Sequence, residues 1–457
     1  MVYNSILFLL FFLPAAIGIY YLVPAGWKNG VLVLENLLFY AWVGKEYLPI
    51  AIILILLHYA AARVRVRLSN RAGGILTAFS IAATAAVLVL FKFYNSFAAL
   101  FGGEISIFSV LPLGISYYSF KLISYQADVA RGKTAPETNL LDFAAYVLLF
   151  PQILVGPIMR YTEIREELHV PAGRCSVPLF AEGIVLFVFG LAEKVILADG
   201  LGTLWQEVTG SAIGLQNASA PLVWLSLLAY SLQLYFDFSG FSNMSNGLLA
   251  MYGFHGKENF RFPYLSRSIS EFWTRWHISL SQWFRDYVYI SLGGNRRGWA
   301  RQVLNLLVVW LLTGIWHCSN ASMNYLLWGL YYFFLLLFEK RALKPWLARG
   351  KVLPHIYTLL AVVLGWGIFA CSSPGITVPV LFAGLFRMGG VSARYFVRNY
   401  GLLILLAILC STPLPQKIWI RADRVPLLQP VLIAAVLLLS IAYMVATTSA
   451  SALYMGF

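Results

Sequence analysis

The sequence predicts an all-α protein that crosses a membrane many times. Of its 457 residues, 60% are hydrophobic and only 11% are charged, a composition that excludes a soluble globular protein. The net charge of +14 is spread over the connections between apolar stretches and forms no charged tail. This pattern fits the positive-inside rule and attraction to anionic lipid. We therefore expect a lipid bilayer as a partner and no nucleic acid.

Apolar segments of helical length follow one another along the whole chain. They predict 10 to 13 crossings together with re-entrant and interfacial helices. The segments are Asn4–Val23, Val31–Ala62 with a break near Gly44, Ile75–Phe101, Ile105–Tyr125, Leu140–Pro157, Leu179–Ala198, Pro221–Tyr252, Val303–Trp316, Tyr325–Phe338, Leu353–Cys371, Val378–Phe386, Leu402–Thr412 and Leu427–Thr447. No internal repeat interrupts this order. We treat residues 1–457 as one domain, with core motifs in 111–335 and peripheral helices in 353–457.

The chain carries signals of orientation near its N-terminus. No basic residue precedes the first apolar segment, so an uncleaved membrane helix is favoured over a signal peptide. Four arginines between Arg63 and Arg71 form the densest basic loop of the first half, which predicts a cytoplasmic loop. We expect the N-terminus on the outside.

Polar groups and helix breakers interrupt three apolar segments. Leu111–Asp128 and Leu148–Arg160 contain them, and Pro151 and Pro157 would break a helix in the second. A polar stripe that includes Asp237 lies within Pro221–Tyr252. Irregular backbone and ionisable groups at membrane depth are tolerated where they line a cavity, so these segments indicate a site. Four scattered cysteines (Cys175, Cys318, Cys371 and Cys410) contain no CxxC pair, and we expect no metal.

The stretch after Pro263 is rich in tryptophan and holds one histidine, His277. As a single helix it would place one set of residues on an aromatic face, with His277 at the edge and Arg285 and Asp286 on the opposite side. The face would comprise Ile269, Phe272, Trp273, Trp276, Leu280, Trp283, Phe284 and Tyr287. Because charged groups at the bilayer centre are costly, we expect an interfacial helix that does not span.

A second histidine, His317, follows an apolar run of only 14 residues, Val303–Trp316. About 20 residues are needed to cross the hydrocarbon, so we expect a broken helix that ends at depth beside the polar stretch 318–324. A neutral imidazole there would serve as general base for an attacking hydroxyl. The alternative is a structural core histidine.

Other candidate residues have weaker support. His277 would orient reactants or stabilise negative charge, or else it is an interfacial histidine. Cys318 as a nucleophile is disfavoured, because neighbours on a helix point in different directions. The GGNRRG stretch lacks the lysine-serine pair of a phosphate loop and predicts a basic turn, where Arg296 and Arg297 could meet donor phosphates.

Several longer motifs resemble the membrane-bound O-acyltransferase superfamily, within its bacterial alginate and peptidoglycan O-acetylation branch. They are PLGISYYSFKLISYQADVARG, FPQILVGPIMRY, YFDFSGFSNM, EFWTRWHISLSQWF and LTGIWH. The resemblance implies a ring of helices around a central funnel, with His317 as the catalytic histidine and His277 as the histidine of a second motif. Further pocket or donor-contact candidates are Trp276, Asn259, Arg285, Asp286, Arg296, Trp316 and Asp237.

The resemblance also implies the reaction and its partners. Acetyl-CoA would be the acyl-thioester donor on the cytoplasmic side, with no bound cofactor. An extracytoplasmic esterase-like protein would complete transfer to a cell-surface polymer, and the location would be a bacterial cytoplasmic membrane. Tyr454, in the C-terminal LYMGF, is an acyl-relay candidate on the same likeness. The chain departs from the family pattern at Cys318 and Asn243, which affects the expected choice of donor or acceptor.

Two other functions remain open from the sequence. One keeps the fold and transfers D-alanyl from a carrier protein to teichoic acid. The other is a transporter whose broken helices bind a solute at mid-depth.

Overall fold

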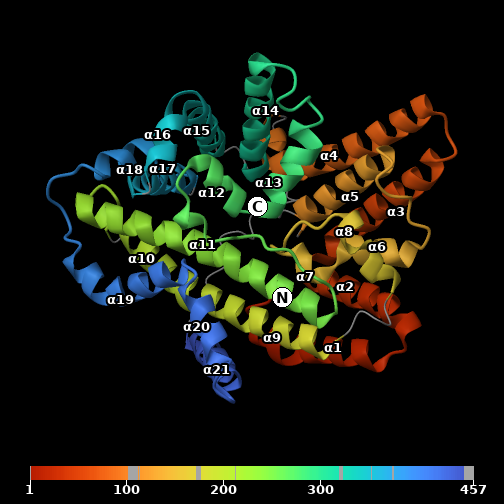
Figure 1. Ribbon diagram of the computed structural model, residues 1–457, viewed down its shortest axis with the longest axis horizontal. Coiled ribbons are helices and arrows are strands. Elements are labelled where there is room, and N and C mark those ends of the chain that lie inside the picture. Colours follow the sequence, from red (N-terminus) through yellow and green to blue (C-terminus); the bar gives the residue numbers. More distant parts are fainter. Residues whose placement is uncertain are drawn as a thin grey trace.

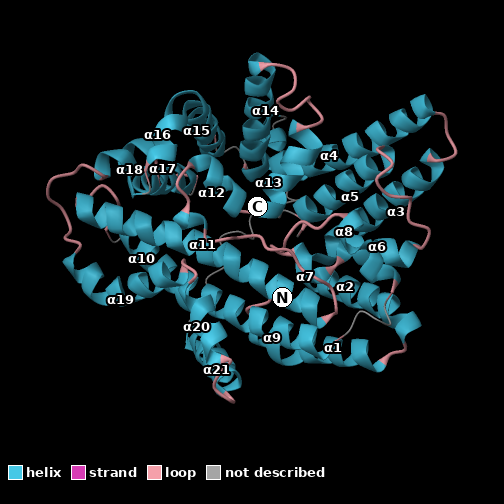
Figure 2. Ribbon diagram, in the orientation of Figure 1, coloured by secondary structure: helices cyan, strands magenta, loops and turns pink. Residues whose placement is uncertain are grey.

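The protein is described by a computed structural model that covers residues 2–100, 112, 114–170, 176–210, 213–318, 323–350, 352–372 and 375–446. These residues form helices and loops without a β-strand (Figure 2). The all-α prediction is therefore confirmed for the described part of the chain.

The helices follow the predicted apolar segments closely. The first third contains η1 (Phe8–Phe12), α1 (Leu13–Leu22), η2 (Ala25–Trp27), α2 (Lys28–Gly44), η3 (Lys45–Tyr47), α3 (Leu48–Arg65), α4 (Asn70–Leu100) and α5 (Ile115–Ala130). The middle contains α6 (Leu140–Leu148), α7 (Phe150–Ile153), α8 (Tyr161–His169), α9 (Val177–Ala192), η5 (Glu193–Ala198), α10 (Asp199–Thr209), α11 (Ala220–Met251), η6 (Pro263–Leu265), α12 (Ile269–Arg275), α13 (Ile278–Phe284) and η7 (Arg285–Tyr289). The last third contains α14 (Trp299–His317), α15 (Asn324–Phe338), η8 (Glu339–Leu343), α16 (Lys344–Arg349), α17 (Val352–Ala370), α18 (Val378–Gly384), α19 (Arg394–Cys410), α20 (Leu414–Ala422) and α21 (Leu428–Ala446).

Among the described residues, five helices are long and apolar enough to cross a membrane. They are Lys45–Arg65, Asn70–Tyr94, Trp299–His317, Val352–Ala370 and Leu428–Ala446. A sixth span is possible if α19 and α20, bent by 75° at their junction, act together. The protein is thus a multi-pass membrane protein. The count of 10 to 13 crossings, the central funnel and the side of the N-terminus stay predictions.

The long helix α11 runs through the middle of the molecule, with α9 packed along it (Figure 1). Glycines allow this close approach. A Cβ added to Gly183 would lie 2.6 Å from the carbonyl oxygen of Gly247, and one added to Gly190 would lie 2.6 Å from that of Gly240. Small residues at matched positions let two membrane helices touch backbone to backbone. Above α11 in Figure 1, α15 and α17 lie toward the left, α14 lies at the top, and α3 to α6 lie toward the right.

The predicted breaks near Gly44 and within Leu148–Arg160 are confirmed. The chain leaves α2 at Gly44, and α7 is followed by irregular backbone up to Arg160. Residues 151–159 are all buried in protein, which is the condition under which non-helical backbone is tolerated in a membrane protein.

The single helix predicted after Pro263 is wrong, because the chain breaks between Trp276 and His277. His277 adopts a left-handed backbone conformation with φ 44°, which separates α12 from α13. The predicted aromatic face is split accordingly. Phe272 and Trp276 pack in the main core, whereas Trp283 and Tyr287 belong to a separate cluster.

The prediction that the run before His317 is too short to span is also wrong. The helix begins at Trp299, four residues before the apolar run, and reaches 19 residues. Its first turn includes polar side chains that a count of apolar residues alone omits. The prediction that the helix ends at His317 is confirmed.

Candidate functional site

His317 occupies the last position of α14, in a surrounding of aromatic rings. Two glycines bring α14 and α15 together: a Cβ on Gly314 would lie 2.8 Å from Tyr325 O, and one on Gly329 would lie 2.6 Å from Trp310 O. His317 as a residue is 3% exposed. Its ring centroid lies 5.2 Å from that of Trp328 and 5.3 Å from that of Phe369.

His277 lies at the junction of α12 and α13, and Asn259 determines its orientation. The Asn259 Oδ1 atom lies 3.2 Å from His277 Nδ1 and also accepts hydrogen bonds from the Ser279 amide and hydroxyl. Because this oxygen can only accept, the ring proton sits on Nδ1 and Nε2 presents a lone pair. Nε2 is buried without a hydrogen-bond partner in the described part of the chain. Burial lowers the pKa of His277 to about 3, so the ring is neutral at physiological pH.

The two histidines flank one indole, that of Trp316. The centroid of the Trp316 ring lies 6.3 Å from that of His277 and 4.5 Å from that of His317. Phe120 packs against the same indole at 5.7 Å, and Phe238 packs against His277 at 4.6 Å. The structure therefore brings together His277, Trp316, His317 and Asn259, which we call the two-histidine site.

The broken segment before Arg160 is joined to this site by hydrogen bonds. The amide of Ile158 donates to Ser279 Oγ at 3.1 Å, and Ser279 Oγ in turn donates to Asn259 Oδ1 at 2.9 Å. The polar breaks predicted in 148–160 thus connect to His277 through two side chains. A network of this kind fixes a ring in one orientation.

Sequence reasoning missed a buried lysine in the same region, Lys92 of α4. Its ammonium donates a hydrogen bond to the backbone carbonyl of Trp316 and lies 5.5 Å from the centroid of the Trp316 ring. Lys92 is 4% exposed. The available signal was a single cation within the otherwise apolar segment Ile75–Phe101, since intramembrane ionisable residues are functional candidates by default.

Two other predicted contact residues have partners of their own in the described part of the chain. Trp276 is buried against Trp366 at 4.7 Å and Phe260 at 5.0 Å. It therefore belongs to the aromatic layer behind the site. Asp237 is paired with Lys194 Nζ at 2.8 Å, and Lys194 also binds Asp199. The polar stripe of α11 faces η5 through this buried ion-pair cluster.

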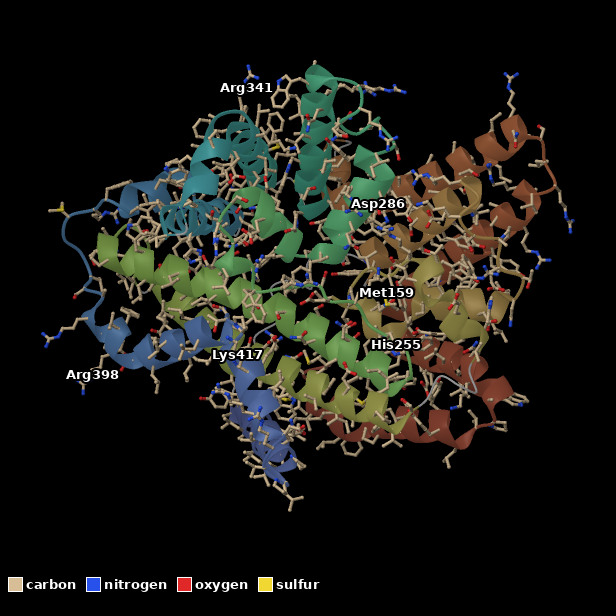
Figure 3. The ribbon with its side chains drawn as sticks, viewed as in Figure 1. Met159, His255, Asp286, Arg341, Arg398 and Lys417 are labelled. Atoms are coloured by element: carbon tan, nitrogen blue, oxygen red, sulfur yellow. The ribbon has the colours of Figure 1, made fainter. Side chains whose placement is uncertain are left out.

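Arg285 and Asp286 are the first residues of η7, which follows α13, and Arg296 lies in the loop beyond η7. Asp286 forms an ion pair with Arg160 Nη2 at 2.7 Å and with Arg285 Nε at 2.8 Å. Figure 3 labels Asp286. Arg296 is exposed in the loop that follows. The structure does not place these three residues at the two-histidine site.

Residues of η7 and just after it belong to a basic face built from three loops. Arg131 donates to the Asp286 carbonyl and to Ser291 Oγ, and Arg65 donates to the Ala130 carbonyl. These bonds join the Arg63–Arg71 loop, the end of α5 and the start of the GGNRRG turn. A cavity of about 590 Å³ lies beside them, lined by Lys133, Thr134, Thr162, Arg165, Glu166, His169 and Val170.

Two carboxylates and a histidine near this cavity have the spacing of a metal site. Ligand atoms of Glu137, Asp142 and His169 lie within 4.8 Å of one another. Glu137 already accepts hydrogen bonds from Tyr161 and His169, which account for its buried charge. The last candidate, Tyr454, lies outside the described residues.

The sequence matches known proteins over most of its length. The profile of the membrane-bound O-acyltransferase family matches residues 135–382. The chain belongs to this family. It is 37% identical over 405 residues to the probable alginate O-acetylase AlgI of Pseudomonas putida, an alignment that covers 85% of this chain and 81% of that protein.

More distant members of the family are also similar to it. The peptidoglycan O-acetyltransferase of Helicobacter pylori is 28% identical, with coverage of 86% of this chain and 81% of that protein. The teichoic acid D-alanyltransferase of Bacillus subtilis is 30% identical over 266 residues, or 55% of this chain and 65% of that protein. The protein is therefore an enzyme, an acyltransferase, as the resemblance to the family implied. The alternative of a transporter is set aside.

Proposed function

We propose that the protein moves acetyl groups from a cytoplasmic thioester, acetyl-CoA, across the membrane for O-acetylation of an extracytoplasmic polysaccharide or peptidoglycan. The observation that carries this proposal is the pair of buried imidazoles on either side of Trp316 at the end of α14. Relatives that are named as O-acetylases of alginate and peptidoglycan support the acetyl group as cargo.

His317 is the general base in this proposal. It takes the proton of an acceptor hydroxyl while the hydroxyl oxygen attacks the thioester carbonyl carbon. A C–O ester bond forms, the C–S bond breaks, and the imidazolium returns the proton to the leaving thiolate. His277 offers its Nε2 lone pair to the reacting groups, since Nδ1 is engaged by Asn259.

The basic face supports a cytoplasmic approach of the donor. Cationic loops gather on the cytoplasmic side of membrane proteins, and this face carries Arg65, Arg131 and Lys133. Tyr287, at this face, follows His277 by ten residues of helix, which is about 15 Å at ~1.5 Å per residue. Phosphates held at the face would leave an extended thioester arm pointing along α13 toward the histidines.

The acceptor side requires a partner. We propose that an extracytoplasmic esterase-like protein completes the transfer to the polymer, and that Tyr454 relays the acyl group. The location would be the cytoplasmic membrane of a bacterium, with residues 1–457 acting as one domain.

A second candidate is D-alanyl transfer from a carrier-protein thioester to teichoic acid. The similarity to the D-alanyltransferase of Bacillus subtilis favours it. Mass spectrometry of the modified polymer separates the two functions, because a D-alanyl ester contains nitrogen and an acetyl ester does not.

The test uses a bacterial strain whose own membrane O-acetyltransferase gene is deleted. The wild-type chain should restore ester-linked acetyl on the purified surface polymer, and His317→Ala should lower it at least about 100-fold, the range of a lost general base. The control is His255→Ala, a residue labelled in Figure 3. Its side chain is 74% exposed and pairs with Glu167. Acetylation retained by His317→Ala at equal membrane level would refute the role of His317.

A further inference from the structure

The C-terminal end of α14 depends on a cation from another helix. The last four carbonyls of a helix lack a partner within it, and the Trp316 carbonyl is one of them. The amide of Cys318 turns back to the Gly314 and Ile315 carbonyls, so it does not satisfy Trp316. Lys92 of α4 supplies the donor for the Trp316 carbonyl.

The same ammonium also contacts the Trp316 side chain. It lies 5.5 Å from the centroid of the indole, a distance at which a cation is attracted to the ring face. Lys92 therefore holds both the backbone and the ring of the residue that separates His277 from His317.

The location of Lys92 makes an incidental role implausible on energetic grounds. A cation in a membrane span is costly unless its charge is compensated, and Lys92 lies within the span Asn70–Tyr94. Charge-assisted hydrogen bonds are about twice as strong as neutral ones, and a cation at a helix C-terminus is stabilised by the helix dipole. Both compensations come from the end of α14.

We propose that Lys92 is a positioning residue of the acyl transfer: it fixes Trp316 and thereby the spacing of the two imidazoles that receive the thioester and the acceptor hydroxyl. The proposal rests on the proposed function of His317. It assigns to Lys92 no contact with the substrate.

A second buried lysine provides a matched control. Lys121 of α5 donates to the Tyr146 carbonyl at 2.8 Å and lies 5.1 Å from the Tyr146 ring centroid. It is as buried as Lys92, with 2% exposure, and makes the same two kinds of contact. Its bonds join α5 to α6, however, and do not involve α14.

The experiment measures label transfer to the polymer in inverted membrane vesicles supplied with radiolabelled acetyl-CoA at several concentrations. Lys92→Met should lower kcat about 100-fold, because a misplacement of about 1 Å costs this much, and leave the KM for acetyl-CoA unchanged. Lys92→Arg keeps a cation and should recover kcat to within about tenfold of wild type. Lys121→Met should keep the wild-type kcat per folded molecule, counted by gel filtration of the solubilised chain.

The proposal is overturned if Lys92→Met keeps its kcat, or if Lys92→Met and Lys121→Met lose kcat equally. It is also overturned if Lys92→Arg is as impaired as Lys92→Met while folded. The outcomes separate from those of the proposed function. If His317→Ala is active, the proposed role of His317 as general base is refuted. If His317→Ala is inactive and Lys92→Met is active, only the proposed role of Lys92 is refuted.

Discussion

Asn259 holds His277 from 18 positions earlier in the chain, with its Oδ1 atom 3.2 Å from the imidazole Nδ1. The same oxygen accepts from the Ser279 amide, and the Asn259 carbonyl accepts from the Ile278 amide. One residue thus both starts α13 and selects the tautomer of His277. The function of the ring and the local fold cannot be separated at this position.

The first prediction concerns this double role. Asn259→Ala removes the cap of α13 and the acceptor for Nδ1, so we expect a loss of about 1 kcal/mol in stability together with a fall in O-acetylation. Asn259→Asp retains an acceptor oxygen and should keep α13 and part of the activity. Thermal unfolding in detergent and polymer-bound acetyl measure the two effects.

The matched control for this prediction is Asn246→Ala. This variant loses the hydrogen bond that the Asn246 side-chain amide donates to the Lys257 carbonyl. Equal acetylation by Asn259→Ala and wild type would contradict the assigned orientation of His277.

The positions of the helices could be predicted from the sequence because they depend on local composition. The segments Leu179–Ala198 and Pro221–Tyr252 reappear as α9 with η5 and as α11, with ends shifted by only one or two residues. The end of α14 at His317 was equally predictable, since small polar residues follow it. These features need no information from elsewhere in the chain.

The site could be predicted only in part, because its geometry depends on distant residues. The break at His277 is set by Asn259, and a helix period read along 263–287 passes straight through it. Lys92 reaches a carbonyl 224 positions away, so no local pattern links it to Trp316. The sequence predicts Asp237 as a pocket residue because it stands as a single charge within an apolar segment. Its partner Lys194 lies on another helix, so the local pattern does not reveal the ion pair.

A second prediction concerns the pH dependence of stability at the basic face. Burial alone would raise the pKa of Asp286, but hydrogen bonds and charges from Arg285 and Arg160 outweigh it and hold the pKa below its ordinary value. Such a group stabilises the fold above its unfolded pKa of about 3.9, and the contribution is lost as pH falls through the lower folded value. Asp286→Asn should therefore lower stability near pH 7 by about 1.5 to 3 kcal/mol. Asp286→Asn should also reduce the loss of stability that follows acidification below about pH 4. Unfolding in detergent from pH 7 to pH 3 measures both, and an unchanged pH profile would count against the ion pair.

A third prediction concerns Tyr454. If its hydroxyl relays the acyl group, Tyr454→Phe should lower polymer acetylation while acetyl-CoA consumption by vesicles persists through hydrolysis. Phe keeps the ring and removes only the nucleophilic oxygen, so membrane level should not change. Tyr443→Phe, on α21, is the control for the loss of a tyrosine hydroxyl near the same end. Full acetylation by Tyr454→Phe would exclude the relay.

A fourth prediction concerns the contact that places His317. A Cβ at Gly329 would lie 2.6 Å from the Trp310 carbonyl oxygen, a backbone atom that cannot move without shifting α14. Gly329→Ala should therefore separate α14 from α15, cost about 1 to 3 kcal/mol through overpacking, and displace Trp328 from the His317 ring. The control is Gly18→Ala in α1, where no atom lies within 4 Å of the added Cβ and alanine favours the helix. Because His317 and every polar group of the site remain in Gly329→Ala, a loss of acetylation in excess of the loss of folded protein reports on ring placement alone. A variant with wild-type stability and acetylation would show that α15 does not position His317.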